Sequence, residues 1–306
     1  MFKHLVVPLD GSKLAEAALP VAAGLAQVLK ASVTLLHIIE RNPPEEVHGE
    51  PHLTDAAEAE VYLRQIAAAA FPGVLGVRTH VHTAEVGDVA RSIVEHGEEL
   101  APDLIVLCTH GRGGLRGLLY GSIAQQVVGH GSTPVLLIPP RAATHPAAFT
   151  CRRLLIALDA SSMHDEALQP AVELAQATGA VVHLLMVVPT LGTLKGDQVA
   201  MRKLLPGTMS AILDIEEDGA EVHLRQHREA LEAAGLKVDV EVGRGEPANV
   251  IVKSARRAKA DLIVLGTHGR IGVDALWSGS TAPKVSARSH LPLLLVPLGE
   301  RPGGQA

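Results

Sequence analysis

The 306-residue sequence has few aromatic residues and only two cysteines. Three Phe, two Tyr and one Trp, with a formal net charge of −6, supply neither the stacking platforms nor the basic surface that nucleic-acid binding uses. Cys108 and Cys151 form neither a paired-thiol motif nor a zinc-ligand pattern, which fits a reducing compartment and not a disulfide framework. We therefore expect no nucleic-acid partner.

Long apolar runs are also absent. No stretch reaches the roughly 18 apolar residues that a membrane-spanning helix needs, so no membrane association is expected. The first seven residues lead directly into a strand-like run and do not resemble a secretory signal. With 47% hydrophobic and 20% charged residues, the composition is typical of a globular protein, which we expect to be cytoplasmic.

The chain contains an internal duplication. Three pairs of segments repeat in the same order, namely residues 5–12 with 154–161, 103–112 with 261–270, and 134–139 with 292–297. A proline-containing stretch lies between the two copies, as expected of a linker. The repeat therefore predicts a first domain over residues 1–140, a linker over 141–150 and a second domain over 151–300.

Each half alternates strand-like and helix-like segments. In the first half, short apolar runs predict strands over residues 4–9, 32–39, 77–85, 103–108 and 134–138. Helical spacing predicts helices over residues 14–29, with Ser12 as N-cap, 89–100 and 123–128. This alternation predicts an α/β fold with a parallel sheet covered on both faces, whose ligands bind at the carboxyl ends of the strands. The stretches after the second strands, 41–54 and 189–219, are expected to be irregular, mobile insertions over the site.

A glycine-rich motif follows the fourth strand of each half. The second half has Gly266-Thr267-His268-Gly269, nine residues, and then Gly279-Ser280-Thr281; the first half has Cys108-Thr109-His110-Gly111, nine residues, and then Gly121-Ser122. Glycines let the backbone approach an anion, and the amino terminus of the following helix adds N–H donors and a positive dipole end. The motif predicts phosphate binding in both halves, with simple tight turns as the alternative.

The glycine motif, the strand-end residues Asp10 and Asp159, and the element order resemble the universal stress protein family in its ATP-binding branch. The resemblance implies two tandem Rossmann-like (adenine nucleotide alpha hydrolase-like) domains, each a five-stranded parallel sheet with helices on both faces. It also implies ATP, with or without Mg²⁺, across the first and fourth strands. The last strands, residues 135–138 and 293–296, would pair in an internal pseudo-dimer, and a homodimer is left open.

Nucleotide-contacting residues follow from the motif and the resemblance. In the first half they are Pro8, Leu9, Asp10, Ile38, Gly87, Cys108, His110, Gly111, Arg112, Gly121, Ser122 and Ile123. In the second half they are Ala157, Leu158, Asp159, Val187, Gly245, Gly266, His268, Gly269, Arg270, Gly279, Ser280 and Thr281. The aspartates would lie near ribose, Ile38 and Val187 would present backbone groups to adenine, and the glycines and hydroxyls would hold phosphates. Cys108 and Ala157 depart from the family pattern, which has glycine and proline there.

Competing motifs are weaker. Residues 243–248 imitate a dinucleotide fingerprint but follow the third strand and not the first, and no P-loop motif occurs. His80 and His82 would share one strand face, but further metal ligands are not evident nearby, so we expect a solvated face and no metal site.

Enzymatic activity is not indicated. Arg112, Arg116 and Arg270 would neutralise phosphate charge, but no carboxylate recurs in the glycine loops, so any ATP hydrolysis should be slow. The sequence thus predicts an adenine-nucleotide-binding stress or signalling protein with no catalytic residues. The alternatives are a nucleotide-independent interaction module of the same fold and a true ATPase or phosphotransferase.

Overall fold

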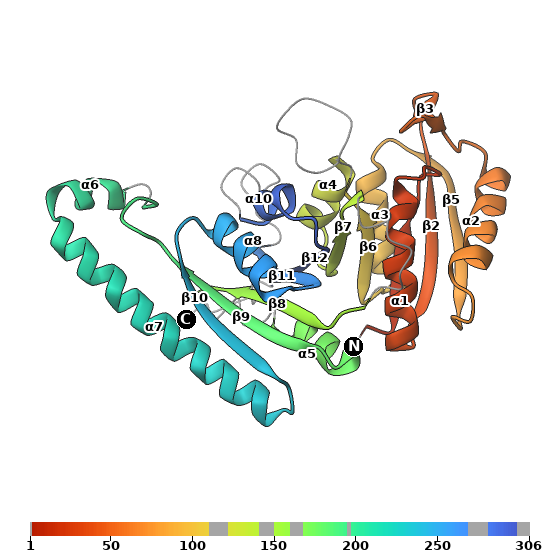
Figure 1. Cartoon of the computed structure of the whole chain (residues 1–306). Helices are drawn as coiled ribbons and strands as arrows, with labels where there is room; N and C mark the ends of the chain where they lie inside the picture. The colour runs from red at the N-terminus through yellow and green to blue at the C-terminus, as the bar shows by residue number, and fades with distance from the viewer. Residues whose placement is uncertain are drawn as a thin grey trace, which may run out of the picture. The chain divides into compact units, whose positions relative to one another are not determined.

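The computed structural model describes residues 2–109, 122–140, 150–159, 168–194, 197–268 and 281–298 (Figure 1). The chain divides into two compact units, the first formed by residues 1–150, 267–286 and 290–306 and the second by residues 151–266 and 287–289. In the described part of the chain, every helix is too short or too polar to cross a membrane.

The first unit is built on a parallel sheet. Its strands are β1 (His4–Pro8), β2 (Ser32–Glu40), β5 (Val77–Val86), β6 (Leu104–Cys108) and β7 (Val135–Ile138), in the order β5-β2-β1-β6-β7. One more strand, β12 (Leu293–Leu298), runs antiparallel to β7. The apolar runs predicted from the sequence are these strands, and side chains such as Leu5, Leu35 and Ile105 are fully buried between the sheet and its helices.

Helices connect the strands of the first unit. They are η1 (Ala15–Ala18), α1 (Leu19–Leu29), α2 (Ala56–Ala70), α3 (Val89–Leu100) and α4 (Ser122–His130). The predicted helix over residues 14–29 begins as the 3-10 turn η1, whose N-cap residue is Leu14 and not the expected Ser12. The Ser12 hydroxyl still accepts a hydrogen bond from the Ala15 amide, at 3.1 Å, and so supports the turn that precedes the helix. Asp55 caps α2 by accepting hydrogen bonds from two amides of its first turn.

The second unit repeats the same strand order. Its strands are β8 (Arg153–Leu158), β9 (Val181–Val188), β10 (Val238–Arg244) and β11 (Leu262–His268), paired in parallel as β10-β9-β8-β11. Its helices are α5 (Leu168–Thr178), α6 (Asp197–Leu204), α7 (Pro206–Ala233) and α8 (Pro247–Ala258). The helix α10 (Thr281–Arg288) follows β11 in sequence, but most of its residues belong to the first unit. The first strand of each half lies between its second and fourth, which creates the predicted switch point.

One anchor contact is duplicated together with the sheet. Asp103 Oδ2 accepts hydrogen bonds from the amides of residues 3–4, at 2.7 and 2.9 Å. Asp261 Oδ2 makes the same two contacts to the amides of residues 152–153, also at 2.7 and 2.9 Å. In each half, the residue before the fourth strand thus fixes the start of the first strand, so the duplication extends to the contacts that set the sheet register.

The stretches after the second strands contain more secondary structure than expected. Residues 41–54 carry a short antiparallel hairpin, β3 (Glu46–Val47) with β4 (Glu50–Pro51), drawn at the top of the orange region in Figure 1. The expectation of irregular structure over 189–219 is wrong, because α6 and the start of α7 occupy most of that stretch. Buried residues at helical spacing along α7, such as Met209 and Leu213, explain the difference.

Candidate functional site

A pocket lies at the carboxyl ends of β1, β2 and β6 in the first unit. Six of the residues predicted to contact a nucleotide line it, namely Pro8, Leu9, Asp10, Ile38, Cys108 and Ile123. Its volume is about 100 Å³, roughly two-thirds of the 150 Å³ of an engineered protein cavity that binds benzene. The described residues therefore form a slot on the scale of a single aromatic ring system.

The pocket wall is mainly apolar with a few polar side chains. Leu36 and Ile38 of β2, Ile93 of α3 and Leu107 of β6 supply aliphatic surface. Four polar groups that also line the pocket are Asp10, His37, Glu40 and His52, of which only the first was predicted from the sequence. Apolar walls with few polar groups are typical of small-molecule sites.

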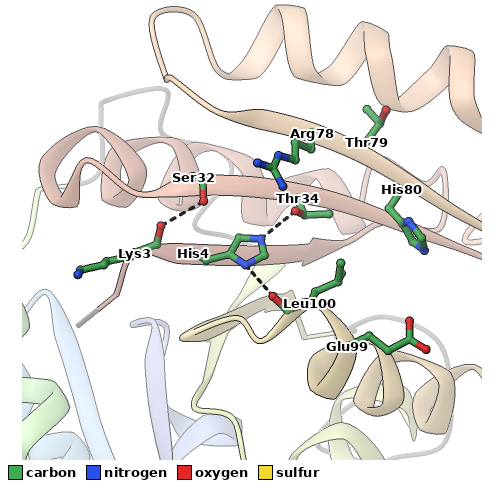
Figure 2. Close-up of a pocket in the computed structure, with 9 residues that line it drawn as sticks. All are labelled: Lys3, His4, Ser32, Thr34, Arg78, Thr79, His80, Glu99 and Leu100. Atoms are coloured by element: carbon green, nitrogen blue, oxygen red, sulfur yellow. Dashed lines mark hydrogen bonds between the residues drawn. The ribbon is translucent and has the colours of Figure 1, made fainter.

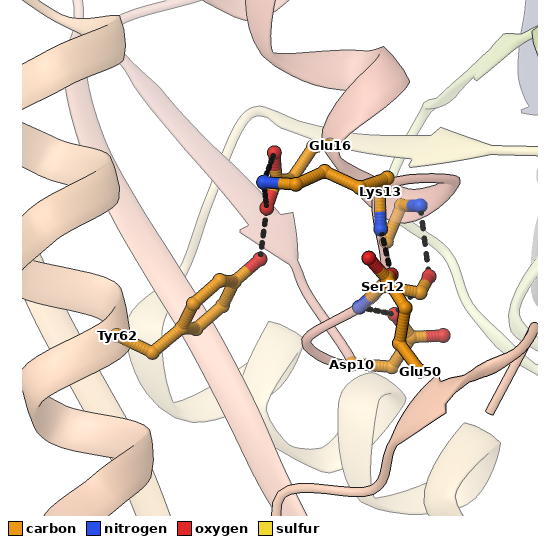
Figure 3. Close-up of polar contacts among 7 residues, drawn as sticks. Asp10, Ser12, Lys13, Glu16, Glu50 and Tyr62 are labelled. Carbon is orange, nitrogen blue, oxygen red and sulfur yellow. Dashed lines mark hydrogen bonds and ion pairs between the residues drawn. The ribbon is translucent and has the colours of Figure 1, made fainter. Parts of the chain in front are cut away.

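The turn after β1 is organised by Asp10 (Figure 3). Asp10 Oδ1 accepts hydrogen bonds from the amide and the hydroxyl of Ser12, at 2.9 and 2.7 Å. Its Oδ2 lies 4.0 Å from His48 Nε2. Oδ1 of Asp10, the residue predicted to lie near ribose, thus also holds the turn in place.

Two neighbouring segments hold the same turn (Figure 3). The Lys13 amide donates to Glu50 Oε2 of the hairpin, and Tyr62 of α2 donates to Glu16 Oε1 at 3.3 Å. Burial, reinforced by the charge of Glu16, raises the pKa of Tyr62 above its ordinary value of 10.0, so its hydroxyl remains a donor. The turn after β1, which borders the pocket, is therefore held by contacts with both the hairpin and α2.

His37 connects the floor of the pocket to the segment above it. This buried residue of β2 places Nδ1 2.7 Å from the Leu9 carbonyl oxygen and Nε2 3.1 Å from the Leu53 carbonyl oxygen. Carbonyl oxygens only accept hydrogen bonds, and a neutral imidazole has a single N–H. A neutral His37 ring therefore donates to one of these two carbonyl oxygens, whereas the imidazolium form donates to both.

Cys108 lies where the family pattern has glycine. Its side chain lines the pocket and its residue is 5% exposed, with Sγ 3.7 Å from the Thr109 carbonyl oxygen. Burial, together with the charge of Asp10, raises the pKa of this thiol to about 12. The Cys108 side chain is therefore a neutral group that fills space in the pocket wall, and we do not expect it to act as a nucleophile.

The corresponding strand ends of the second unit carry Ala157, Leu158, Val187 and Gly266, at the carboxyl ends of adjacent strands. Gly245 adopts a φ of +140° after β10, and its amide donates to the Val188 carbonyl oxygen at 3.0 Å. The backbone conformation explains why glycine occupies this turn. Gly87 follows β5 at the equivalent place, Asp159 is exposed after β8, and Thr281 begins α10.

The predicted phosphate loops fall mostly outside the described residues. These positions are His110, Gly111, Arg112, Arg116, Gly121, Gly269, Arg270, Gly279 and Ser280. The backbones of Ser122 and His268 are described within α4 and β11, but their side chains are not. Phosphate binding by these loops stays a prediction.

The histidines of β5 do not form the solvated face expected from the sequence. The rings of His80 and His82 pack against that of buried His96 from α3, with centroids 5.0 and 4.8 Å apart. Burial, followed by the charges of His96 and His82, lowers the pKa of His80 below 6.5. Among the described residues, no group of three or more side chains has an arrangement suited to a metal ion.

A second pocket, of about 590 Å³, opens at the amino ends of β1, β2 and β5 (Figure 2). His4 crosses it, with Nε2 2.8 Å from Thr34 Oγ1 and Nδ1 3.1 Å from the Leu100 carbonyl oxygen. Parallel α/β sheets bind ligands at the opposite, carboxyl ends of their strands. We therefore place the candidate site at the smaller pocket.

The family of the chain follows from its match to known sequences. The model of the universal stress protein family matches residues 1–139 and 150–297, in two copies. The chain belongs to the universal stress protein family. The resemblance seen in the sequence and the tandem α/β fold are thereby confirmed.

Individual relatives agree with this assignment. A universal stress protein of Methanocaldococcus jannaschii is 33% identical over 150 residues, which are 47% of this chain and 81% of that protein. A universal stress protein of Mycolicibacterium smegmatis is 24% identical over 308 residues, covering 95% of this chain and 96% of the relative. The crystal structure of a universal stress protein from Archaeoglobus fulgidus superposes with a TM-score of 0.67 at 20% identity, covering 97% of both chains. It shares the fold over almost the full length.

Proposed function

We propose that this universal stress protein binds ATP or a close adenine nucleotide and acts in stress response or signalling through nucleotide occupancy. The observation that carries the proposal is the pocket at the carboxyl ends of β1, β2 and β6. It brings together six residues that the sequence had nominated independently, from three strands and the start of α4.

The chemistry of the pocket supports a planar, mostly apolar ligand group with a polar extension. Aliphatic residues such as Leu36 and Ile38 suit a base, and Asp10 at the rim suits hydroxyl groups of a sugar. Phosphates would extend towards the glycine motif that follows β6, with Mg²⁺ as a counter-ion when it is present. We expect no more than slow hydrolysis of a bound ATP.

The second half belongs to the same proposal. Its strand ends repeat the arrangement of the first half, so we propose a second nucleotide site beside Leu158, Val187 and Gly266. We also propose domain boundaries at residues 140 and 151, a cytoplasmic location, and an internal pseudo-dimer of the two halves.

Two measurements test nucleotide binding. Acid denaturation of the purified protein should release adenine nucleotide, and calorimetric titration of the nucleotide-free protein with ATP should show saturable binding. No released nucleotide together with a flat titration would instead support a nucleotide-independent interaction module.

A pair of cysteine variants locates the first site. Cys108→Leu adds bulk inside a pocket of about 100 Å³ and should abolish the ATP binding of the first half. Cys151→Leu is the matched control, because Cys151 is equally buried, at 5% exposed, but lies in the second unit. Unchanged ATP titration of Cys108→Leu, with the fold intact by circular dichroism, would place the nucleotide elsewhere.

A further inference from the structure

His52 projects into the candidate nucleotide pocket from the segment that follows the hairpin. Its side chain is 7% exposed and lines the pocket together with Ile38 and Glu40 of β2. Its backbone amide donates to the Glu45 carbonyl oxygen at 3.1 Å, across the base of the hairpin. His52 is thus a buried polar side chain in a mainly apolar wall.

The segment that carries His52 is fastened on both sides. The Leu53 carbonyl oxygen is hydrogen-bonded to His37, and Glu50 accepts the amide of Lys13. The Leu53 side chain packs over Gly11, whose φ is +91° and where a Cβ atom would lie 2.8 Å from Leu53 Cδ1. These contacts hold the segment that carries His52 beside the candidate pocket.

One ring nitrogen of His52 has no hydrogen-bond partner among the described residues. His52 Nδ1 is buried and makes no hydrogen bond with the residues that the structure describes. Buried polar atoms in folded proteins nearly always have a hydrogen-bond partner, because an unsatisfied one loses its hydration without compensation. Because His52 lines the candidate pocket, a polar group of a bound ligand would supply the partner that this nitrogen lacks.

The other ring nitrogen determines which kind of group that is. His52 Nε2 lies 3.8 Å from Glu40 Oε2. A carboxylate favours the tautomer with the proton on the nitrogen that faces it, here Nε2, and this tautomer has a lone pair on Nδ1. His52 Nδ1 is then a hydrogen-bond acceptor, and its ligand partner must be a donor.

Among purines, this requirement selects adenine. Adenine has an exocyclic amino group at its six-position, which donates, whereas guanine has a carbonyl oxygen there, which accepts; hypoxanthine has the same carbonyl. We propose that His52 Nδ1 accepts a hydrogen bond from the 6-amino group of the bound base and so makes the first site selective for adenine over 6-oxo purines. This inference rests on the proposed nucleotide binding and names its specificity-determining residue.

A comparison of ATP with ITP tests the inference, since the two nucleotides share the ribose and the triphosphate. The full-length protein should bind ATP more tightly than ITP at the first site, by about 5- to 150-fold, the range for leaving a buried acceptor facing another acceptor. The first site is isolated by subtracting the isotherm of Cys108→Leu. His52→Phe should weaken ATP binding and bring the two affinities within about twofold, whereas His130→Phe, at an exposed histidine of α4, should change neither.

A second variant and a spectroscopic measurement cover the possibility that His52→Phe does not fold. Glu40→Gln removes the carboxylate but leaves the ring in place, so the ATP preference should fall while the melting temperature changes little. Nitrogen-15 NMR of the His52 ring should show protonation at Nε2 and not at Nδ1.

The outcomes separate this inference from the proposed function. Equal affinity for ATP and ITP, a preference for ITP, or a preference that survives His52→Phe would overturn the role of His52 while leaving nucleotide binding intact. Failure of both nucleotides to bind would overturn the proposed function itself.

Discussion

Removal of the His37 side chain should release the segment above the pocket. His37→Leu places an apolar side chain of similar size in β2 and deletes the hydrogen bonds to the Leu9 and Leu53 carbonyl oxygens. The first of these holds the end of β1, and the second holds the backbone beside His52. We therefore expect a modest loss of overall stability and a larger local effect on residues 46–54.

The magnitude follows from the two contacts. A hydrogen bond contributes about 0.5–1.5 kcal/mol net, and about 1.5–3 kcal/mol when one partner is charged, as the imidazolium form of His37 would be. Loss of the Leu53 contact should then ease local opening by about 0.5–3 kcal/mol. This corresponds to an increase of roughly 2- to 150-fold in the opening equilibrium, since about 1.4 kcal/mol is a factor of ten.

Hydrogen–deuterium exchange measured by mass spectrometry is the assay, because exchange of backbone amides reports local opening. Peptides covering residues 46–54 should exchange faster in His37→Leu by a factor within that range. His4→Leu is the matched control, since His4 also makes two hydrogen bonds from its ring but at the amino end of β1. If exchange of these peptides rises equally in both variants, or in neither, His37 does not fasten the segment and the reasoning is refuted.

Three further predictions concern ionisation and the duplicated anchor. Burial opposes ionisation of Glu241, but hydrogen bonds from Arg257, Ser254 and His183 outweigh it and hold the pKa of Glu241 below 4.5. Its stabilisation is therefore complete above about pH 4.5 and lost as the pH falls through the folded-state pKa, so Glu241→Gln should flatten the acid limb of the stability profile measured by urea unfolding. Burial raises the pKa of both cysteine thiols to about 12, so neither should react with iodoacetamide at pH 8 until the protein unfolds, and rapid labelling of the native protein would contradict their burial. Asp103→Ala and Asp261→Ala each remove two hydrogen bonds to a carboxylate and should destabilise their units by similar amounts, about 3–6 kcal/mol in urea unfolding, whereas a loss in only one would show that the anchors are not equivalent.

The sheet was predictable because its strands are nearly continuous apolar runs bounded by turns. The strand predicted over residues 103–108 is β6, Leu104–Cys108, and the other strands of the first half agree to within about one residue at each end. Short, nearly continuous apolar runs are typical of strands that are buried on both faces of a sheet, so few other structures fit them. The helical character of 189–219 was missed because its glycines and prolines suggested a loop, whereas packing of one apolar face of α7 outweighs their low helix propensity.

The sequence predicted the residues of the candidate pocket that lie at strand ends. It did not predict those that the hairpin segment contributes. Asp10, Ile38 and Cys108 follow from the position at which a buried strand stops, since parallel strands end at a common edge. His37 had a usable signal, because it is a polar residue inside the otherwise apolar run of β2. His52 had none, because its place in the pocket is set by contacts of the hairpin with residues far away in the sequence.

The two halves share the strand order and the motif after the fourth strand, but they differ in the segment after the second strand. The switch-point strand order and the anchors Asp103 and Asp261 are repeated, and so is the glycine motif after the fourth strand. After the second strand, however, the first half has the β3–β4 hairpin and the second half has α6 and the long helix α7. In the first half this segment supplies His52. Selectivity that depends on His52 is therefore expected to be confined to the first half, so that the duplicated chain would hold two nucleotide sites with a shared way of binding phosphate and different preferences for the base.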